Sequence, residues 1–99
     1  MICYFVAMKM IKHHNITVIG KVQGVFYRQS TFEIANQLRI KGFVRNEPNG
    51  NVCIEAEGTE EELKKLIEWC KKGPPRANVV DVKFTEGEMK NFFSFEIKR

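Results

Sequence analysis

Hydrophobic and polar positions along the chain fall into short runs that predict five strands and two helices. Residues 15–22 are β-branched and apolar, which is typical of a buried strand. Residues 51–57 alternate instead, so that apolar side chains face one way and polar side chains the other. Strands are expected over residues 15–22, 43–47, 51–57, 79–85 and 93–97. In the fourth of these, Val80, Val82 and Phe84 are expected to share one face.

The apolar period changes from two to about 3.6 in two segments, which predicts the helices. The first helix begins near Tyr27, with Gly42 at its expected C-cap. In the second helix, Thr59 and Glu62 have the spacing of a capping box, and residues 73–75 (Gly-Pro-Pro) end it. The apolar stripes are Thr31, Ile34, Ala35 and Leu38 in the first helix and Leu63, Leu66, Ile67 and Cys70 in the second.

The order of these elements is strand, helix, strand, strand, helix, strand and one more short strand. A tight turn at residues 48–50 (Pro-Asn-Gly) joins the second and third strands and separates two strand–helix–strand units. The pattern predicts an α+β, ferredoxin-like βαββαβ fold, with two helices on one face of a mostly antiparallel sheet and a short fifth C-terminal strand. Right-handed crossovers bring the ends of the first two strands together, so segments 20–28 and 45–46 should meet.

Composition and charge narrow the class of protein. A chain of 99 residues, 43% hydrophobic and 28% charged, has the length and composition of one globular domain, which excludes a disordered tail or a coiled-coil rod. No apolar run approaches the length of a membrane span, so no membrane partner is expected. Residues 1–50 carry seven basic and two acidic side chains, whereas residues 51–99 carry nine and ten. A small anionic ligand is therefore expected in the first half.

The cysteines and histidines favour a reducing compartment and offer no metal site. Cys3, Cys53 and Cys70 are an odd number at wide spacing, without a Cys-x-x-Cys pair. His13 and His14 are adjacent, precede the first expected strand and are expected to be solvated. This set lacks the spacing of zinc ligands. We therefore expect a cytoplasmic protein that holds no metal and no other cofactor.

The segment Gly20–Arg28 (Gly-Lys-Val-Gln-Gly-Val-Phe-Tyr-Arg) runs from a strand into the start of a helix. Its glycines let successive backbone N–H groups curl around an anion, and the helix N-terminus adds partial positive charge. Arg28 in the first helical turn can fold back and grip phosphate oxygens bidentately. The expected phosphate-binding residues are Gly20, Lys21, Val22, Gln23, Gly24, Val25, Phe26 and Arg28. On composition alone, a glycine-tightened turn with a surface arginine explains the segment equally well.

Two motifs resemble those of the acylphosphatase family. Gly20–Arg28 matches the first signature, Gly-x-Val-Gln-Gly-Val-x-Phe/Tyr-Arg, at every specified position. Gly42–Gly58 resembles the second signature, which reads Gly-aromatic-Val-basic-Asn and continues to Gly-x-Val and a later glycine. The resemblance covers roughly residues 14–99, and two long signatures in the right order are highly specific.

The resemblance implies both an organisation and a function. It implies a ferredoxin-like acylphosphatase domain over residues 13–99, preceded by an N-terminal extension over residues 1–12. It also implies an enzyme that hydrolyses small acyl phosphates to a carboxylate and inorganic phosphate without metal. In such an enzyme Arg28 and Asn46 are the catalytic residues. Arg28 binds the phosphate together with the backbone N–H groups of the loop before the first helix, here called the cradle, and Asn46 holds the attacking water.

Two other interpretations stay open: an RNA-binding ferredoxin-like module and a non-catalytic module that binds small anions. A basic ferredoxin-like sheet is also the RNA-recognition fold. However, the open face of the third strand here carries Cys53, Glu55 and Glu57, which offer no stacking platform and repel phosphate. Intact Arg28 and Asn46 favour the enzyme. We therefore expect a small-molecule acyl phosphate as the substrate, no nucleic acid partner, and a monomer.

Overall fold

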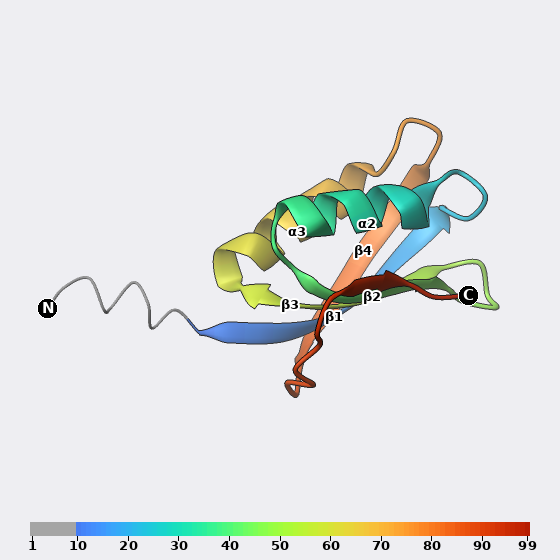
Figure 1. The fold of residues 1–99 in the computed structure, drawn as a ribbon. Coiled ribbons are helices and arrows are strands. Elements are labelled where there is room, and N and C mark those ends of the chain that lie inside the picture. Colours follow the sequence, from blue (N-terminus) through green and yellow to red (C-terminus); the bar gives the residue numbers. More distant parts are fainter. Residues whose placement is uncertain (1–9) are drawn as a thin grey trace, which may run out of the picture.

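The computed structural model describes residues 10–99, in which two helices cover one face of a five-stranded sheet (Figure 1). The strands are β1 (Ile11–Lys21), β2 (Lys41–Asn46), β3 (Val52–Thr59), β4 (Asn78–Gly87) and β5 (Phe95–Ile97), and the helices are α2 (Tyr27–Gln37) and α3 (Glu60–Lys72). Among these described residues, neither helix has the length and apolar character that crossing a membrane requires.

The sheet confirms the ferredoxin-like prediction. Its strand order is β4-β1-β3-β2-β5. β1 pairs antiparallel with both β3 and β4, and β2 pairs antiparallel with β3. β5 lies parallel to β2 at the edge, as the short fifth strand. Because β3 lies between β1 and β2, the chain leaves both of those strands at the same end of the sheet, and that end holds the site described below.

The core lies between the sheet and the helices. Alternate residues of β1 and β3 point to the helices, and those of β3 are buried as the alternating pattern predicts. α3 buries the stripe that its sequence predicts. The central buried side chains are Ile16, Val18, Val52, Ile54, Ala56, Leu63, Leu66, Ile67 and Cys70. This packing fixes both helices against the sheet and therefore fixes where the first turn of α2 lies.

β1 begins at Ile11, four residues before the expected start. Ile11 pairs with Thr59 on β3, so both histidines lie inside the strand. The expectation that His13 is solvated is wrong, because this side chain is only 1% exposed. Of the expected N-terminal extension, residues 1–9 lie outside the described residues, and the structure places Ile11 and Lys12 in β1.

Gly42 does not cap the first helix. α2 ends at Gln37, and the left-handed residue that follows it is Arg39, with a φ of 63°. Gly42 lies in β2 with a φ of 144°, where a Cβ atom would meet the carbonyl group of Glu55 on β3. The glycine is required for the close approach of two strands. The apolar period predicts the helix, but it does not distinguish a glycine that caps a helix from one that lets two strands approach closely.

The edge strands differ from the expected pattern. A register shift opposite Ile19 and Gly20 breaks the alternation of β4, so Val79 and Val82 pack against the core while Val80 is 74% exposed. The expectation that Val80 shares a face with Val82 is therefore wrong. The last strand is also shorter than expected, because the 97% exposed Phe93 precedes β5.

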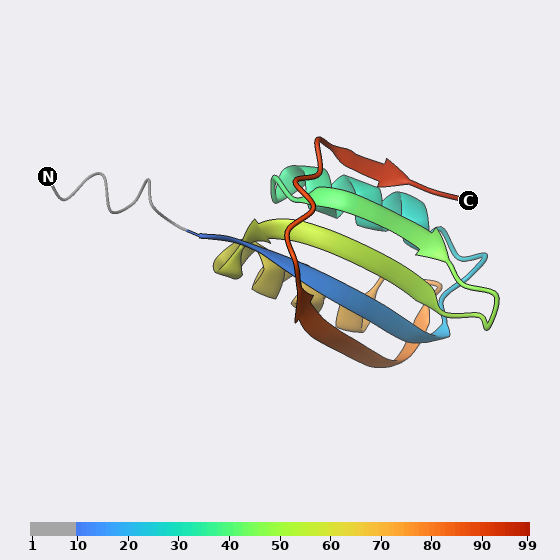
Figure 2. The same cartoon turned by 90° about the horizontal axis from the view of Figure 1, so that it is seen from below.

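Residues 88–94, here called the strap, cross the open face of the sheet from β4 at one edge to β5 at the other (Figure 2). Glu57 on β3 holds the strap by accepting hydrogen bonds from the backbone N–H groups of Lys90 at 2.6 Å and Phe92 at 2.9 Å. His13 Nδ1 lies 2.8 Å from the same carboxylate. This network explains why two polar residues, His13 and Glu57, are buried on the open face of the sheet. It also fixes the strap, which leads the chain to β5 beside β2.

Candidate active site

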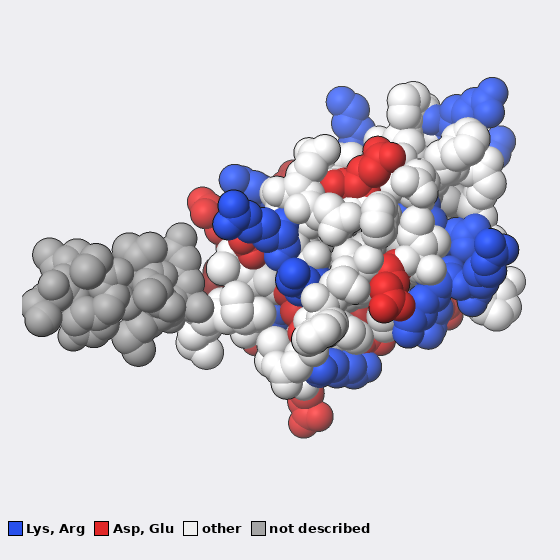
Figure 3. Space-filling model, viewed as in Figure 1, with Lys and Arg blue, Asp and Glu red and all other residues white. Residues whose placement is uncertain are grey.

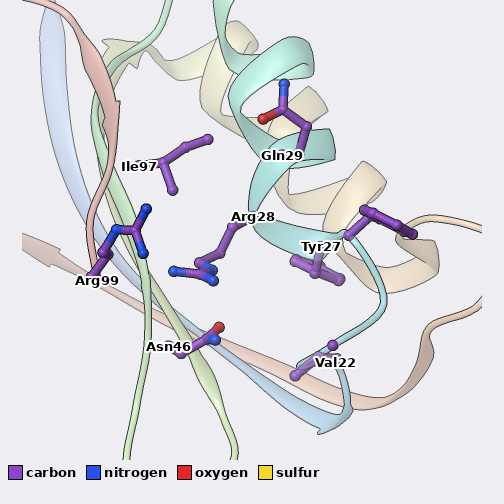
Figure 4. Close-up of a pocket in the computed structure, with 9 residues that line it drawn as sticks. Val22, Tyr27, Arg28, Gln29, Asn46, Ile97 and Arg99 are labelled. Carbon is purple, nitrogen blue, oxygen red and sulfur yellow. The ribbon is translucent and has the colours of Figure 1, made fainter.

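A pocket of about 560 Å³ opens where the first turn of α2, the end of β2 and the tail of β5 come together (Figure 4). It is lined by Val22, Gly24, Phe26, Tyr27, Arg28, Gln29, Asn46, Ile97 and Arg99. None of these side chains is acidic, and two are arginines. The lining therefore favours a small anion.

The loop from β1 to α2 turns sharply through two left-handed residues. Gly24 has a φ of 72°, and Phe26, directly before the helix, has a φ of 64° and a ψ of 24°. A left-handed conformation is costly for a residue that carries a side chain, and such strain is concentrated at functional sites. Backbone turns of this kind make successive N–H groups converge on one point, where they can bind an anion.

The N-terminus of α2 has no cap of its own. The side chain of Phe26, the N-cap residue, makes no capping hydrogen bond, and no acidic residue lies in the first turn. The first N–H groups of a helix have no partner within the helix, and they carry partial positive charge. An anion bound in the pocket would supply the missing acceptors.

Gln23 braces this loop against the turn between β2 and β3. Its Nε2 donates hydrogen bonds to the carbonyl oxygens of Glu47 and Asn51, both at 2.8 Å. Tyr27 anchors the other side, since its hydroxyl donates to the carbonyl oxygen of Cys70 at 2.8 Å. The structure thus confirms that the segments after the first and second strands meet, although they are more than twenty residues apart in sequence.

The structure brings together part of the expected phosphate-binding set. Of the eight expected residues, Val22, Gly24, Phe26 and Arg28 line the pocket, and so does Asn46, the residue expected to hold the water. The other four do not line it: Gly20, Lys21, Gln23 and Val25. Of these, Lys21 is exposed at the end of β1, Val25 is buried, and Gln23 faces the β2–β3 turn.

Arg28 is held across the pocket by the tail of the chain. Its Nη1 donates to the carbonyl oxygen of Lys98 at 3.1 Å. Figure 4 shows its guanidinium group pointing from α2 toward Asn46 at the end of β2. Within residues 10–99, none of the ion pairs involves Arg28. The arginine is therefore positioned by a neutral carbonyl group and keeps its charge available for a ligand.

Four residues that line the pocket are not predicted as site residues from the sequence: Tyr27, Gln29, Ile97 and Arg99. Ile97 ends β5, and Arg99 follows it two residues later. Both are far in sequence from the β1–α2 loop, and they lie at the pocket because β5 pairs with β2. Since alternate residues of a strand share a face, Ile97 and Arg99 fall on one side. That alternation is a usable signal once the fifth strand is placed next to the second.

The basic side chains near the pocket differ in whether an acidic side chain is paired with them. Lys and Arg atoms gather at the end of the molecule that holds the β1–α2 loop and the C-terminus (Figure 3). Arg45 is paired with an acidic side chain, because its Nε donates to the Glu47 carboxylate at 2.8 Å. This hydrogen bond raises the pKa of Arg45. Arg45 therefore serves the β2–β3 turn, whereas Arg28 faces the pocket.

Cys53 and Cys70, the thiols within the described residues, do not line the pocket and are not activated. Burial raises the pKa of Cys53, and it raises the pKa of Cys70 to about 12. Both side chains are thiols at neutral pH and are poor nucleophiles. Within residues 10–99, no three His, Cys, Asp or Glu side chains come together in a group that could hold a metal ion. The reactive features of the pocket are amide, guanidinium and backbone N–H groups.

Comparisons with known proteins point to one family. The sequence model of the acylphosphatase family matches residues 14–97. An acylphosphatase of Acaryochloris marina is 49% identical over 82 residues, which cover 83% of this chain and 88% of that protein. A solved acylphosphatase of Coxiella burnetii superposes with a TM-score of 0.86 at 35% identity, covering 89% of this chain and 93% of that one. An acylphosphatase of Bacillus subtilis superposes with a TM-score of 0.87 at 34% identity, covering 91% and 100%.

Proposed function

The chain belongs to the acylphosphatase family, and from that premise we propose that the pocket hydrolyses small acyl phosphates by means of the backbone cradle, Arg28 and Asn46. The observation that carries this proposal is the meeting of Arg28 and Asn46 in an acid-free pocket at the uncapped N-terminus of α2. The products are a carboxylate and inorganic phosphate.

In this proposal the phosphoryl group lies in the curve of the loop over residues 22–26. Backbone N–H groups of the loop and of the first turn of α2 donate to its oxygens. Arg28 closes over it, with Nη1 kept on the carbonyl oxygen of Lys98 and its other N–H groups donating to the phosphate. Positioning and charge neutralisation are what phosphoryl transfer chiefly requires, so these groups supply most of the catalysis.

Asn46 orients the attacking water in this proposal. A carboxamide has no useful pKa and cannot act as a general base, but its oxygen and nitrogen can fix a water by hydrogen bonds. The water oxygen bonds to phosphorus as the bond from phosphorus to the bridging oxygen breaks. The electron pair leaves with the carboxylate, and the proton of the water passes to a phosphate oxygen or to solvent. Because a carboxylate is a weak base, its departure needs little help from an acid.

The covered sheet face supports the enzyme over an RNA-binding module. RNA-recognition sheets stack bases on exposed aromatic side chains of the open face. Here the strap crosses that face, and Glu57 and His13 lie beneath it. The two carboxylates of β3 on this face, Glu55 and Glu57, are bound to Lys90 and to backbone N–H groups of the strap. This side of the protein therefore supports structure, and the basic charge gathers at the pocket.

Phosphate release from acetyl phosphate and from a phosphate monoester tests the proposal. We expect rapid hydrolysis of acetyl phosphate and little hydrolysis of p-nitrophenyl phosphate, because the pocket offers no group that acts as an acid for a basic leaving group. Excess chelator should leave the rate unchanged. Comparable rates on both compounds, or no release from acetyl phosphate, would contradict the proposal. A monomeric, cytoplasmic enzyme remains our expectation, which gel filtration and cell fractionation can check.

A further inference from the structure

Arg99 is a second cation in the pocket, and the proposed mechanism does not use it. The residue lines the cavity together with Arg28, and no ion pair or side-chain hydrogen bond of the described residues engages its guanidinium group. In Figure 4 its side chain reaches from the tail of β5 toward Arg28. Two guanidinium groups that make no ion pair within residues 10–99 therefore face one pocket, and no acidic side chain lines it.

The alternation of the C-terminal strand explains this placement. Lys98 continues the pairing with β2, since its N–H donates to the carbonyl oxygen of Val44 at 2.8 Å. Its ammonium group lies 4.3 Å from the centre of the Phe43 ring, on the strap side of the sheet. Arg99 continues this alternation beyond the end of β5 and lies on the opposite side, where it lines the pocket as Ile97 does. Arg99 is thus directed into the pocket by the sheet register.

Arg28 separates Arg99 from the cradle. Arg28 donates to the carbonyl oxygen of Lys98, the residue adjoining Arg99, and its guanidinium group points toward Asn46. A phosphoryl group in the loop over residues 22–26 is bound by that loop and by Arg28. In Figure 4 Arg28 lies between Arg99 and Val22, so the charge of Arg99 lies on the side of Arg28 away from the loop. A substrate whose phosphoryl group fills the loop could reach Arg99 only with its acyl part. A neutral acyl group would leave that charge unmatched.

We propose that Arg99 determines specificity by binding a second negative charge on the acyl group of the substrate. The inference rests on the proposed function. The preferred substrate class is acyl phosphates that carry a further carboxylate or phosphate, over acyl phosphates of uncharged acids. An arginine suits this role because its planar fork can bind a carboxylate or a phosphate bidentately.

Succinyl phosphate and butyryl phosphate provide the test, because they share a four-carbon acyl group and differ by a terminal carboxylate. We expect a higher kcat/KM for succinyl phosphate, and we expect Arg99→Gln to reduce the succinyl-to-butyryl ratio about five- to tenfold, as a charge-assisted pair near the surface would. Arg99→Lys should keep part of the preference. The matched control is Lys83→Gln, which removes the same charge from β4 and should change the ratio less than about twofold by the same reasoning.

Two results with the variants would overturn this assignment. An equal loss for both substrates in Arg99→Gln would place Arg99 on the phosphoryl group. An equal change of the ratio in Lys83→Gln would show a long-range field and no local contact. The corresponding succinyl and butyryl phosphonates, which resist hydrolysis, separate the two proposals. Preferential, Arg99-dependent binding of succinyl phosphonate without turnover of either phosphate would support the anion site and refute the enzyme. Turnover of both phosphates without preference would do the reverse.

Discussion

The two helices pack on the same face of the sheet, but they differ in whether their own residues cap the N-terminus. At α3, the Thr59 side chain accepts from the N–H of Glu62, and the Glu62 carboxylate accepts from the N–H of Thr59. Three glutamates in its first turn match the helix dipole. At α2, a left-handed Phe26 stands at the N-cap without a capping hydrogen bond, and no acidic residue lies in the first turn. One helix terminus is closed by its own residues, and the other is open.

The difference separates stability from function. Capping groups satisfy orphan N–H groups and contribute to folding, as the sequence around Thr59 does. The open N-terminus of α2 gives up that contribution and keeps donors and an arginine in fixed positions for a ligand. Fixed donors that need no reorganisation are what electrostatic catalysis requires. Variants at the two termini should therefore lose different properties: activity at α2 and stability at α3.

Arg28→Ala should have the largest effect, because it removes the charge that closes the open terminus. We expect at least a thousandfold loss of kcat/KM, since Arg28 combines a donor and a full charge. Binding of inorganic phosphate, measured by calorimetry, should be lost as well, while the unfolding midpoint stays near that of the wild type. Arg28→Lys should also fail badly, because an ammonium group cannot reproduce the planar fork. Near-normal turnover in Arg28→Lys would argue against bidentate binding.

Asn46→Ala should come next, with a loss of turnover on the order of a hundredfold by analogy with lost positioning groups. Inhibition by inorganic phosphate should persist, because the loop and Arg28 remain. Asn46→Asp is the sharper variant: its carboxylate should repel phosphate and weaken that inhibition more than alanine does. A loss of phosphate binding in Asn46→Ala that matches the loss of turnover would make Asn46 a phosphate ligand and not a holder of water.

Glu57→Gln should reduce stability near the capped terminus of α3, since Glu57 lies two residues before Thr59. Burial disfavours the Glu57 carboxylate, but hydrogen bonds from Lys90, His13 and Phe92 outweigh it and hold the pKa of Glu57 below its usual 4.5. The unfolded chain therefore takes up this proton first, and the stabilisation, present above pH 4.5, is lost as pH falls through the native pKa. Urea unfolding at neutral pH should show a loss of about 2–3 kcal/mol. A loss that stays equally large at pH 3 would contradict this linkage.

Thr59→Ala should have the smallest effect, a loss of about 1 kcal/mol in the free energy of unfolding. The variant breaks one half of the capping box and touches no residue of the pocket. We expect kcat and KM for acetyl phosphate to stay within about twofold, as for surface changes away from a site. A loss of activity without a loss of stability would show that the two helix termini are coupled.

The sequence predicted the parts of the fold that follow a regular period. The alternation of β3, the apolar stripe of α3 and the Thr59 capping box all lie where the pattern places them. The predicted start of β1 is four residues too late, because His13 and His14 look like solvated residues until the strap that covers His13 is known. Val80 was misplaced because a bulge in an edge strand leaves no trace in the alternation itself.

The candidate site was predicted unevenly for a related reason. Arg28 and Asn46 stand in sequence motifs, and crossover geometry predicts that their segments meet. The contribution of Ile97 and Arg99 depends on which strand β5 joins, and a three-residue strand gives no local signal for its partner. The position of Gln23 between the glycines predicts a phosphate ligand, yet its amide donates to the β2–β3 turn.

The central claim is that the open terminus of α2, with Arg28 and Asn46, directs water at phosphorus. Hydrolysis of acetyl phosphate in heavy-oxygen water with excess chelator tests it most directly, with the label located by mass spectrometry of both products. The account predicts an undiminished rate and the label in inorganic phosphate. Label in the acetate would mean attack at the acyl carbon, and a rate restored only by added magnesium or zinc would mean metal catalysis. Either result would contradict the account.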